Sequence, residues 1–514
     1  MKKRKIVSTL LALLLLASMP VSALAAEWDI SKGDITVNAG SGGQTVTQGS
    51  QVDVPDSAPV ITGSSTENTL TINAEKDQTA NVTLSDVNID VSSEGKAAVT
   101  TTGEGNVSIE LNGDNTLKSG KGHAGLEKKN GGKLTIADED KNGKLTAEGG
   151  KYGAGIGGGD QGAGSGITIT GGEIKATGGQ YGAGIGGGKG DGSDITISGG
   201  EVNATGGTSG AGIGGGYNGN GSDITITDGE VNATGGKYGA GIGGGEYGIG
   251  KDIIITGGEV NATGGRFSAG IGGGSRGTGS DITISGGEVN ASGGVNGAGI
   301  GGGLRSKGKD ITVSGDTKLK VQGGDEDHYD GAGAGIGDGG SRPKGSTGGS
   351  PIPGAEVKPD TSGLTTNGKI ERYAPGKDMK NDEPEETTVG TLSPQEKPVE
   401  PIEPTEPAVP EQPEAERGMD APLYRVTDKD SRDIACTAER KDGVLTVTVD
   451  EDFAVLTASL SGMTALRAQG VEKIIFVTNG AKTAVKLSAI ISRLTANGVF
   501  RLTHDGKAVT FTIG

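Results

Sequence analysis

Apolar and polar positions alternate in a short pattern that recurs between residues 151 and 340. In the copy that begins at Gly182, three pieces each carry two apolar residues at positions i and i+2: Ala183 and Ile185, Ile195 and Ile197, and Val202 and Ala204. This spacing places both side chains on one face of a strand. Glycine pairs separate the pieces, and no stretch has the period of an amphipathic helix. Each copy therefore predicts three short strands.

The copies recur every 28 or 29 residues. Their shared motif, Gly-Ala-Gly-Ile-Gly-Gly-Gly or a variant of it, contains the isoleucines Ile156, Ile185, Ile213, Ile242, Ile271 and Ile300. Repeats of this length indicate a solenoid. We therefore predict a mainly β protein whose body is a parallel β-helix, with each coil paired to the coil before it at about 4.8 Å. Equivalent side chains should then stack in columns.

Both ends of the solenoid differ from the regular repeats of residues 151–340. Weaker alternation over residues 26–150 predicts irregular first coils, and a cap is expected because an open solenoid end exposes a sheet edge. Residues 341–421, first rich in Gly and Ser and then in Pro and Glu, predict a disordered linker. Its prolines stand at every third residue from 398 to 413, which favours an extended polyproline II spacer.

Residues 422–514 predict a small α+β domain. Strands are expected over 444–449 and 473–477, and a hairpin over 500–513. Helices are expected over 460–469 and 487–494. We find no catalytic motif in this domain.

The composition fits a tightly wound repeat. Glycine accounts for 103 of the 514 residues and aromatic residues for 3%, which excludes an ordinary core of large side chains. Collagen needs glycine at every third position, which is absent here. Cys436 is the sole cysteine, so no disulfide can form within the chain. Packing and backbone pairing alone must therefore stabilise the fold.

The first 25 residues predict a signal peptide. Lys2 to Lys5 form a basic start, an apolar stretch runs from Ile6 to Leu16, and Ala23-Leu24-Ala25 is a small-residue cleavage site. The apolar stretch is short for a membrane span, which needs about 20 residues. We expect a mature chain that starts near Ala26 or Glu27, does not insert into a membrane, and is extracellular, either secreted or associated with the cell wall.

Charge narrows the range of partners. The net charge is -18, and loss of the four cations of the signal peptide would make it about -22. Nucleic acid and anionic membranes are poor partners for such a surface. We expect a monomer.

The repeats resemble a known family. Asp194-Ile-Thr-Ile-Ser-Gly-Gly-Glu-Val-Asn-Ala-Thr-Gly-Gly207, alternating with the Gly-Ala-Gly-Ile-Gly-Gly-Gly motif, is similar to secreted proteins of Gram-positive bacteria that are described as carbohydrate-binding domain-containing proteins. The resemblance covers roughly residues 80–340. It implies a right-handed parallel β-helix, similar to the polysaccharide-lyase scaffold, that binds a polysaccharide or other glycan.

One column of turn residues is aromatic, and it is the candidate carbohydrate-binding site. Tyr152, Tyr181, Tyr238 and Phe267 occupy matching positions, which Ser209 and Asn296 interrupt, while Tyr217 and Tyr247 lie on a neighbouring loop. Exposed rings offer flat apolar area with a polar tip, so successive sugars could lie against them. The alternative is that the rings only cover the glycine-rich turns.

Two further columns are acidic and form the candidate metal site. They contain Glu201, Glu230, Glu259 and Glu288, and Asp194, Asp223, Asp252 and Asp281. Like charges in register destabilise a sheet, so a cation such as calcium would relieve them. No cofactor is required, and the alternative is that these residues form turns and are solvated. Asn203, Asn232, Asn261 and Asn290 predict a hydrogen-bonded ladder.

The expected function is carbohydrate binding without catalysis. An enzyme needs a localised, non-repeating cluster of acidic and basic groups, whereas these coils repeat the same residues. Asp325 to Asp330 is the best non-repeating candidate, and the three histidines, including His123, lie far apart in sequence. Two alternatives remain open: an adhesin or structural stalk that presents the C-terminal domain, and a polysaccharide lyase or other pectin-active enzyme on the same scaffold.

Overall fold

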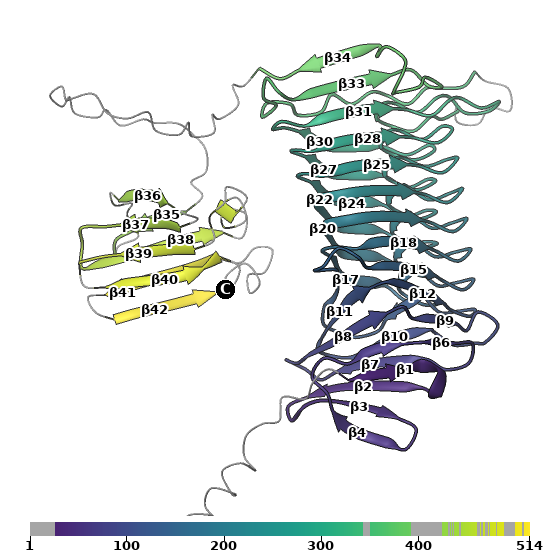
Figure 1. Ribbon diagram of the computed structural model, residues 1–514. Helices are drawn as coiled ribbons and strands as arrows, with labels where there is room; N and C mark the ends of the chain where they lie inside the picture. Colours follow the sequence, from purple (N-terminus) through teal and green to yellow (C-terminus); the bar gives the residue numbers. More distant parts are fainter. Residues whose placement is uncertain are drawn as a thin grey trace, which may run out of the picture. The chain divides into compact units, whose positions relative to one another are not determined.

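The computed structural model describes residues 26–342 and 350–391 and, with gaps of which 488–498 is the longest, residues 424–513. The chain divides into two compact units, Met1–Val399 and Glu400–Gly514. The first unit is a parallel β-solenoid, and the second contains two four-stranded sheets (Figure 1). Among these described residues, no helix is both long enough and apolar enough to cross a membrane.

Each coil of the solenoid contributes one short strand to a 13-stranded sheet. Eleven strands of that sheet pair in parallel. They are β2 (Ile35–Gly40), β7 (Leu70–Ala74), β10 (Val99–Gly103), β13 (Leu126–Lys128), β16 (Ile156–Gly157), β19 (Ile185–Gly186), β21 (Ile213–Gly214), β23 (Ile242–Gly243), β26 (Ile271–Gly272), β29 (Ile300–Gly301) and β32 (Ile336–Gly337).

The other two strands of each coil belong to a 21-stranded sheet. Its strands up to the last coil are β1 (Glu27–Asp29), β5 (Val60–Thr62), β6 (Ser64–Ser65), β8 (Thr79–Ser85), β9 (Asn88–Asp90), β11 (Asn106–Asn112), β12 (Asp114–Lys118), β14 (Leu134–Ala137), β15 (Lys144–Glu148), β17 (Gly164–Ile169), β18 (Glu173–Thr177), β20 (Gly192–Thr205), β22 (Gly221–Thr234), β24 (Gly250–Ile255), β25 (Glu259–Thr263), β27 (Gly279–Ile284), β28 (Glu288–Ser292), β30 (Gly308–Val313) and β31 (Lys318–Gln322). In β20 and β22 the two strands of one coil run together. The prediction of a β-solenoid with three short strands per coil is confirmed.

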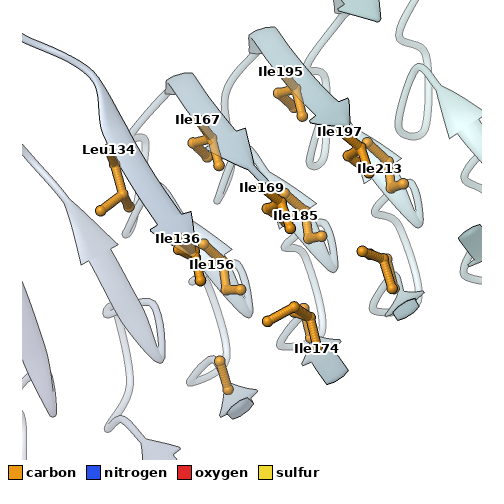
Figure 2. Close-up of a cluster of buried hydrophobic side chains, with 14 of the residues drawn as sticks. Leu134, Ile136, Ile156, Ile167, Ile169, Ile174, Ile185, Ile195, Ile197 and Ile213 are labelled. Carbon is orange, nitrogen blue, oxygen red and sulfur yellow. The ribbon is translucent and has the colours of Figure 1, made fainter. Parts of the chain in front are cut away.

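Identical residues face each other between successive coils. Ile185 pairs with Ile213, Ile197 with Ile226, and Val202 with Val231. Figure 2 shows the resulting rows, in which Leu134, Ile167 and Ile195 follow one another, as do Ile136, Ile169 and Ile197, and Ile156, Ile185 and Ile213. All of these side chains are fully buried. Each buried isoleucine stabilises the fold by roughly 1.5–3 kcal/mol, so the narrow core gains stability with every added coil.

The backbone of the glycine-rich motif makes a tight bend, and some of its glycines leave no room for a side chain. The Ala183 N–H donates to the Gly187 carbonyl oxygen at 2.9 Å, which closes the bend within one coil. Gly243 has a φ of 131°, and a Cβ there would overlap the carbonyl oxygen of Gly272 in the next coil. Both the backbone angle and the close approach therefore require glycine at Gly243.

Antiparallel strands close both ends of the solenoid. At the N-terminal end, β2 pairs with β3 (Gly43–Gln48), which pairs with β4 (Gln51–Pro55) (Figure 1). At the other end, β33 (Lys369–Tyr373) continues the parallel ladder from β31, and β34 (Glu386–Val389) pairs antiparallel with β33. At each end the added strands extend one of the two sheets and cover its last parallel strand, whose open edge would otherwise invite pairing with another chain.

The predicted linker over residues 341–421 is therefore wrong for residues 350–391, which complete the solenoid. Leu364, Ile370 and Tyr373 are buried at its last coil. This segment lacks the glycine motif, because the last coil has no following coil that must approach it closely. Residues 343–349 and 392–423, including the regularly spaced prolines, lie outside the described residues.

The second unit contains the predicted strands and several more. One sheet has the order β35 (Arg425–Thr427), β38 (Phe453–Ser459), β41 (Val499–Asp505) and β42 (Ala508–Ile513), and the other has the order β36 (Thr437–Lys441), β37 (Val444–Thr448), β39 (Lys473–Val477) and β40 (Lys482–Lys486). The strands near 444–449 and 473–477 and the hairpin of β41 and β42 confirm the prediction. Most of both predicted helices lies outside the described residues. Phe476 of β39 and Phe500 of β41 are buried in the core of this unit.

We expect Gly243→Ala to lower the stability of the solenoid by at least about 2 kcal/mol, because the new Cβ adds both backbone strain and overlap with the next coil. Thermal unfolding of the purified variant measures the loss. Gly95→Ala is the matched control, since a Cβ at Gly95 meets nothing within 4 Å. Equal melting temperatures for the two variants would contradict the requirement for glycine at Gly243.

We also expect the second unit to lose stability in acid. His504 is fully buried, its Nδ1 is 3.1 Å from the Thr478 hydroxyl, and its Nε2 is 3.0 Å from that of Thr483. Burial lowers the pKa of His504 below its ordinary value of 6.5. The folded state therefore binds this proton less tightly than the unfolded chain, and stability falls as the pH drops below about 6.5, by at most about 1.4 kcal/mol per pH unit.

Urea unfolding between pH 7 and pH 5 measures this loss, followed through a fluorophore on Cys436, which is exposed in the second unit. His504→Gln should make the unfolding midpoint less dependent on pH. An unchanged pH dependence in this variant would assign the acid sensitivity to other groups.

Candidate functional site

Two sets of turns form one continuous edge of the solenoid. In each coil one turn precedes the strand of the 13-stranded sheet, and one loop follows that strand. The loop N–H donates to a turn carbonyl of the previous coil: Tyr217 to Tyr181 at 2.8 Å, Ser275 to Tyr238 at 2.9 Å and Leu304 to Phe267 at 2.8 Å. We call the combined surface the aromatic edge. It consists of the turns 149–152, 178–181, 206–209, 235–238, 264–267 and 293–296 and the loops 159–163, 188–191, 216–220, 245–249, 274–278 and 303–307.

All four predicted carbohydrate-binding residues lie on the aromatic edge, where they stack in two pairs. The rings of Tyr152 and Tyr181 stack with centroids 5.3 Å apart and planes 15° apart. Those of Tyr238 and Phe267 stack at 5.9 Å and 10°. The stacked faces are turned toward each other. A sugar can therefore reach the outer ring edges and the tyrosine hydroxyls more readily than the flat faces on which the sequence analysis relied.

Tyr217 and Tyr247 lie on the neighbouring loops, as expected, and they belong to the same aromatic set, which the sequence did not predict. Tyr217 meets Tyr181 edge to face at 5.6 Å, and Tyr247 meets Tyr217 at 6.2 Å. Tyr247 is 45% exposed. Loop length alone gave no sign that the two sets of turns meet. The interruptions in the predicted column are polar and buried: the Ser209 hydroxyl donates to Glu246 at 2.7 Å, and the Asn296 amide donates to two backbone carbonyls.

Cations lie beside the rings. Three lysine ammonium groups surround the Tyr152 ring, those of Lys189 at 5.2 Å, Lys151 at 5.3 Å and Lys121 at 5.8 Å from its centroid. Farther along, Lys237 lies 5.0 Å from the Tyr238 ring, Arg266 lies 5.0 Å from Phe267 and Arg276 lies 5.9 Å from Tyr247. Such contacts stabilise the cations by about 0.5–1 kcal/mol each at exposed sites.

The glutamate column stands in register on the large sheet, as predicted. Glu201, Glu230, Glu259 and Glu288 pair with one another along successive strands. A lysine closes each end of the column: Lys144 lies 2.8 Å from Glu173, and Lys318 lies 2.5 Å from Glu288. The hydrogen bond from Lys318 and its charge lower the pKa of Glu288. The ends are therefore neutralised by protein side chains, while the glutamates between them face carboxylates on both sides.

The backbone conformation explains why aspartate recurs in the aspartate column. Asp194, Asp223, Asp252 and Asp281 have φ between 50° and 55°, and Gly166 occupies the same position one coil earlier with φ of 67°. Aspartate and asparagine enter this left-handed region more readily than other side chains. Near its C-terminal end the column borders a groove that Val357, Lys358 and Asp360 line on the other side.

The two acidic columns do not converge on a common point. Among the described residues, the three acidic side chains whose oxygens lie within 4.8 Å of one another are Glu110, Asp138 and Asp140, on earlier coils. The Glu139 N–H donates to Glu110 at 2.6 Å, and burial raises the pKa of Glu110. The structure thus does not bring the predicted calcium ligands together into one coordination sphere.

The predicted asparagine ladder is confirmed. The side-chain amide of Asn232 donates to Asn203 at 3.2 Å, that of Asn261 to Asn232 at 3.0 Å, and that of Asn290 to Asn261 at 2.8 Å. The side chains of these asparagines therefore form hydrogen bonds with one another along the sheet.

A comparison with protein-family models supports the same architecture. The model of the beta helix repeat matches residues 141–160, 167–189, 195–217, 224–246, 253–275 and 282–304. The chain is a β-helix protein. Searches of curated proteins and of solved structures found no match. The matched repeats of this β-helix protein contain most of the aromatic edge.

An earlier coil of the β-helix protein contains a cluster that the sequence analysis did not identify. Glu127 is buried, His123 Nδ1 lies 2.6 Å from one of its oxygens, and Lys129 Nζ lies 2.9 Å from the other. Lys128 is also buried, and its burial lowers its pKa. The sequence signal was present: Glu127 and Lys128 stand where later copies of the motif have glycine.

The acidic insertion Asp325 to Asp330 is anchored by an ion pair. Asp330 is buried and accepts two hydrogen bonds from Arg305, at 2.8 and 2.7 Å. Asp327 accepts from the N–H groups of Tyr329 and Asp330. Asp330, the most buried carboxylate of the insertion, therefore pairs with Arg305 of the preceding coil and has a structural role.

We expect Glu230→Gln to stabilise the β-helix protein by roughly 0.2–1 kcal/mol at low salt, because it removes like charges directly opposite each other. Salt should reduce the gain, since the screening length is about 8 Å at physiological ionic strength. Thermal unfolding at several sodium chloride concentrations measures it.

Glu288→Gln is the matched control and should give no gain, because it removes the partner of Lys318. A destabilised Glu230→Gln variant would contradict the repulsion. The same melts with calcium and with a chelator test the calcium hypothesis: a rise with calcium that Glu230→Gln abolishes would support a bound ion.

Proposed function

We propose that this protein is an extracellular carbohydrate-binding protein that holds a polysaccharide along the aromatic edge without cleaving it. The observation that carries the proposal is the concentration of aromatic side chains. Six of the fourteen aromatic residues of the chain lie on this one edge: Tyr152, Tyr181, Tyr217, Tyr238, Tyr247 and Phe267. None of these six belongs to the solenoid core, which is aliphatic apart from Trp28 near its N-terminal end.

The edge suits a chain-like ligand. Its tyrosines follow the solenoid axis over successive coils, which rise by about 4.8 Å. Tyrosine combines an apolar ring with a hydroxyl that donates and accepts hydrogen bonds, as sugars require. The stacked rings also restrain one another, so little side-chain freedom is lost on binding. A polysaccharide lying along the edge would meet similar groups at each step.

The absence of catalysis is part of the proposal, and the strongest enzymatic alternative rests on His123. The buried Glu127 carboxylate orients its imidazole, as in many general bases. Lys121, two residues earlier, lies beside Tyr152 at the N-terminal end of the aromatic rings. This arrangement is the observation that favours a polysaccharide lyase on the same scaffold. The opposite alternative, a structural stalk, predicts no glycan binding.

We expect Tyr181→Ala and Tyr238→Ala to weaken binding about tenfold each, or about 1.4 kcal/mol, while the melting temperature changes little. Retention on insoluble cellulose, pectin and mucin identifies the glycan, and titration measures the affinity. Ile254→Ala is the control, because Ile254 is 41% exposed on a sheet face away from the rings. Unchanged retention of both tyrosine variants would reject the aromatic edge, and no retention of the wild type would favour the stalk.

We expect no release of unsaturated or reducing sugars from polygalacturonate by the wild-type protein. Absorbance of unsaturated products and a reducing-end assay measure this. His123→Ala is the control: product release by the wild type that this variant lacks would establish the lyase instead.

A further inference from the structure

We propose, on the basis of the function proposed above, that the ligand of the aromatic edge is an acidic polysaccharide whose sugars carry carboxylate or sulfate groups. The inference rests on how charge is distributed over the coils. Charge distinguishes acidic from neutral glycans, whereas aromatic residues alone do not.

Charge is segregated between the aromatic edge and the strands. Residues 149–307 contain nine Lys and Arg and thirteen Asp and Glu. Seven of the nine cations lie on the aromatic edge, but only three of the thirteen anions do. The edge therefore carries a net charge of +4, or +3 once Arg305 is counted together with its partner Asp330, and the rest of these coils carries -8. The seven cations are Lys151, Lys189, Lys237, Arg266, Arg276, Arg305 and Lys307.

Most of the cations beside the rings lack an acidic partner. Lys189 lies 3.7 Å from Asp160. Among the described residues, no carboxylate lies within 4.0 Å of Lys151, Lys237, Arg266 or Arg276. These four are exposed and are placed next to tyrosine or phenylalanine rings. Each can bind an anionic group while a ring contacts the same sugar, and arginine binds carboxylate or sulfate through two parallel hydrogen bonds.

The acidic columns on the strands determine which side of the solenoid a polyanion can bind. A polyanion is repelled by the glutamate and aspartate columns and attracted by the edge, so only one side of the solenoid can accept it. Single-stranded nucleic acid is also a polyanion, but it binds by stacking bases on free ring faces. Here one face of each of these rings is covered by its stacking partner, in the pairs Tyr152–Tyr181 and Tyr238–Phe267, and cations lie beside the rings. The edge therefore fits an acidic glycan better.

The test compares an acidic glycan with its uncharged ester and with two other polyanions. Full-length protein is titrated with polygalacturonate, with its fully methyl-esterified form, with a sulfated glycan and with single-stranded DNA, at several salt concentrations. We expect at least tenfold tighter binding of polygalacturonate or the sulfated glycan than of the ester, lost as salt rises. The triple variant Lys151→Gln/Lys237→Gln/Arg266→Gln should lose this preference and keep its melting temperature.

Lys175→Gln/Lys251→Gln is the matched control, because these are the two cations of the same coils that lie off the edge. Equal binding of the acid and the ester would overturn the acidic class and leave glycan binding standing. Tighter binding of DNA than of any glycan, or binding of none, would overturn the proposed function as well.

A second inference comes from Asp56, at the opposite end of the solenoid from β34. We infer that cleavage after Ala25 creates an α-ammonium group at Ala26 that pairs with the buried Asp56 carboxylate. Asp56 is 1% exposed, and one of its oxygens accepts from the Trp28 indole N–H at 2.9 Å and from the backbone nitrogen of Ala26 at 3.1 Å. The other accepts from the Ala58 N–H at 3.2 Å.

Asp56 needs a cation that the rest of the described chain does not provide. No lysine or arginine of the described residues lies within 4.0 Å of it, and a buried carboxylate without a counter-charge is costly. The Ala26 carbonyl accepts from the Val60 N–H at 2.9 Å, which fixes this residue in place. Ala23-Leu24-Ala25 independently predicts hydrolysis of the Ala25–Ala26 bond, which leaves a carboxylate on Ala25 and a protonated amine on Ala26.

Trp28 provides a local measurement, because it is the sole tryptophan and contacts Asp56. N-terminal sequencing of the secreted protein should begin at Ala26. An amine paired with Asp56 is stabilised in its charged form, so its contribution to stability is present below pH 8 and is lost as the pH rises through its raised pKa. Trp28 fluorescence should titrate in this alkaline range, and acetylation of the N-terminus should lower the melting temperature.

Asp56→Asn should abolish both effects. An N-terminus elsewhere would overturn the inference. So would an acetylated chain with the same melting temperature and the same Trp28 titration as the free amine.

Discussion

The close parallel stacking of coils is the constraint on which the rest of the structure depends. Successive backbones approach so closely that, at Gly243, the carbonyl oxygen of the next coil occupies the place of a side chain. This approach keeps the core of the regular coils narrow and aliphatic, and the buried aromatic residues Trp28 and Tyr373 lie at the two ends of the solenoid. In the regular coils, aromatic and charged side chains therefore stand on the outside, in lines set by the register of the strands, whereas an earlier coil buries Glu127 and Lys128.

The same register that orders the core creates an electrostatic cost on the surface. Equivalent carboxylates stand opposite each other in the glutamate column, and lysines relieve them at both ends. The aspartates differ, because each occupies a left-handed backbone position that glycine can also take. Exposed columns on one solenoid thus arise for different reasons, and the repetition of a residue does not by itself indicate a binding site.

Local spacing predicted the repeating parts of the fold, and it failed where the evidence was not local. The pairs Ile195 and Ile197, and Val202 and Ala204, identified strands correctly because a strand turns its side chains with a period of two. The closing strand that contains Ile370 was missed, since no motif marks a coil without a successor. The contact of Tyr217 with Tyr181 was missed too, because it depends on a backbone hydrogen bond between different coils. The buried Glu127 could have been found, as it breaks the glycine pattern.

Antiparallel strands at both ends have a consequence for how such a chain can change over time. Each internal coil touches only the coil on either side, and neither cap depends on how many coils lie between them. Six similar repeats follow one another along the chain, so a single unit can be added or removed without altering either end. A longer or shorter rod would keep its closed ends and its pitch. Evolution could thereby adjust the length of the exposed edge in single steps without redesigning the protein.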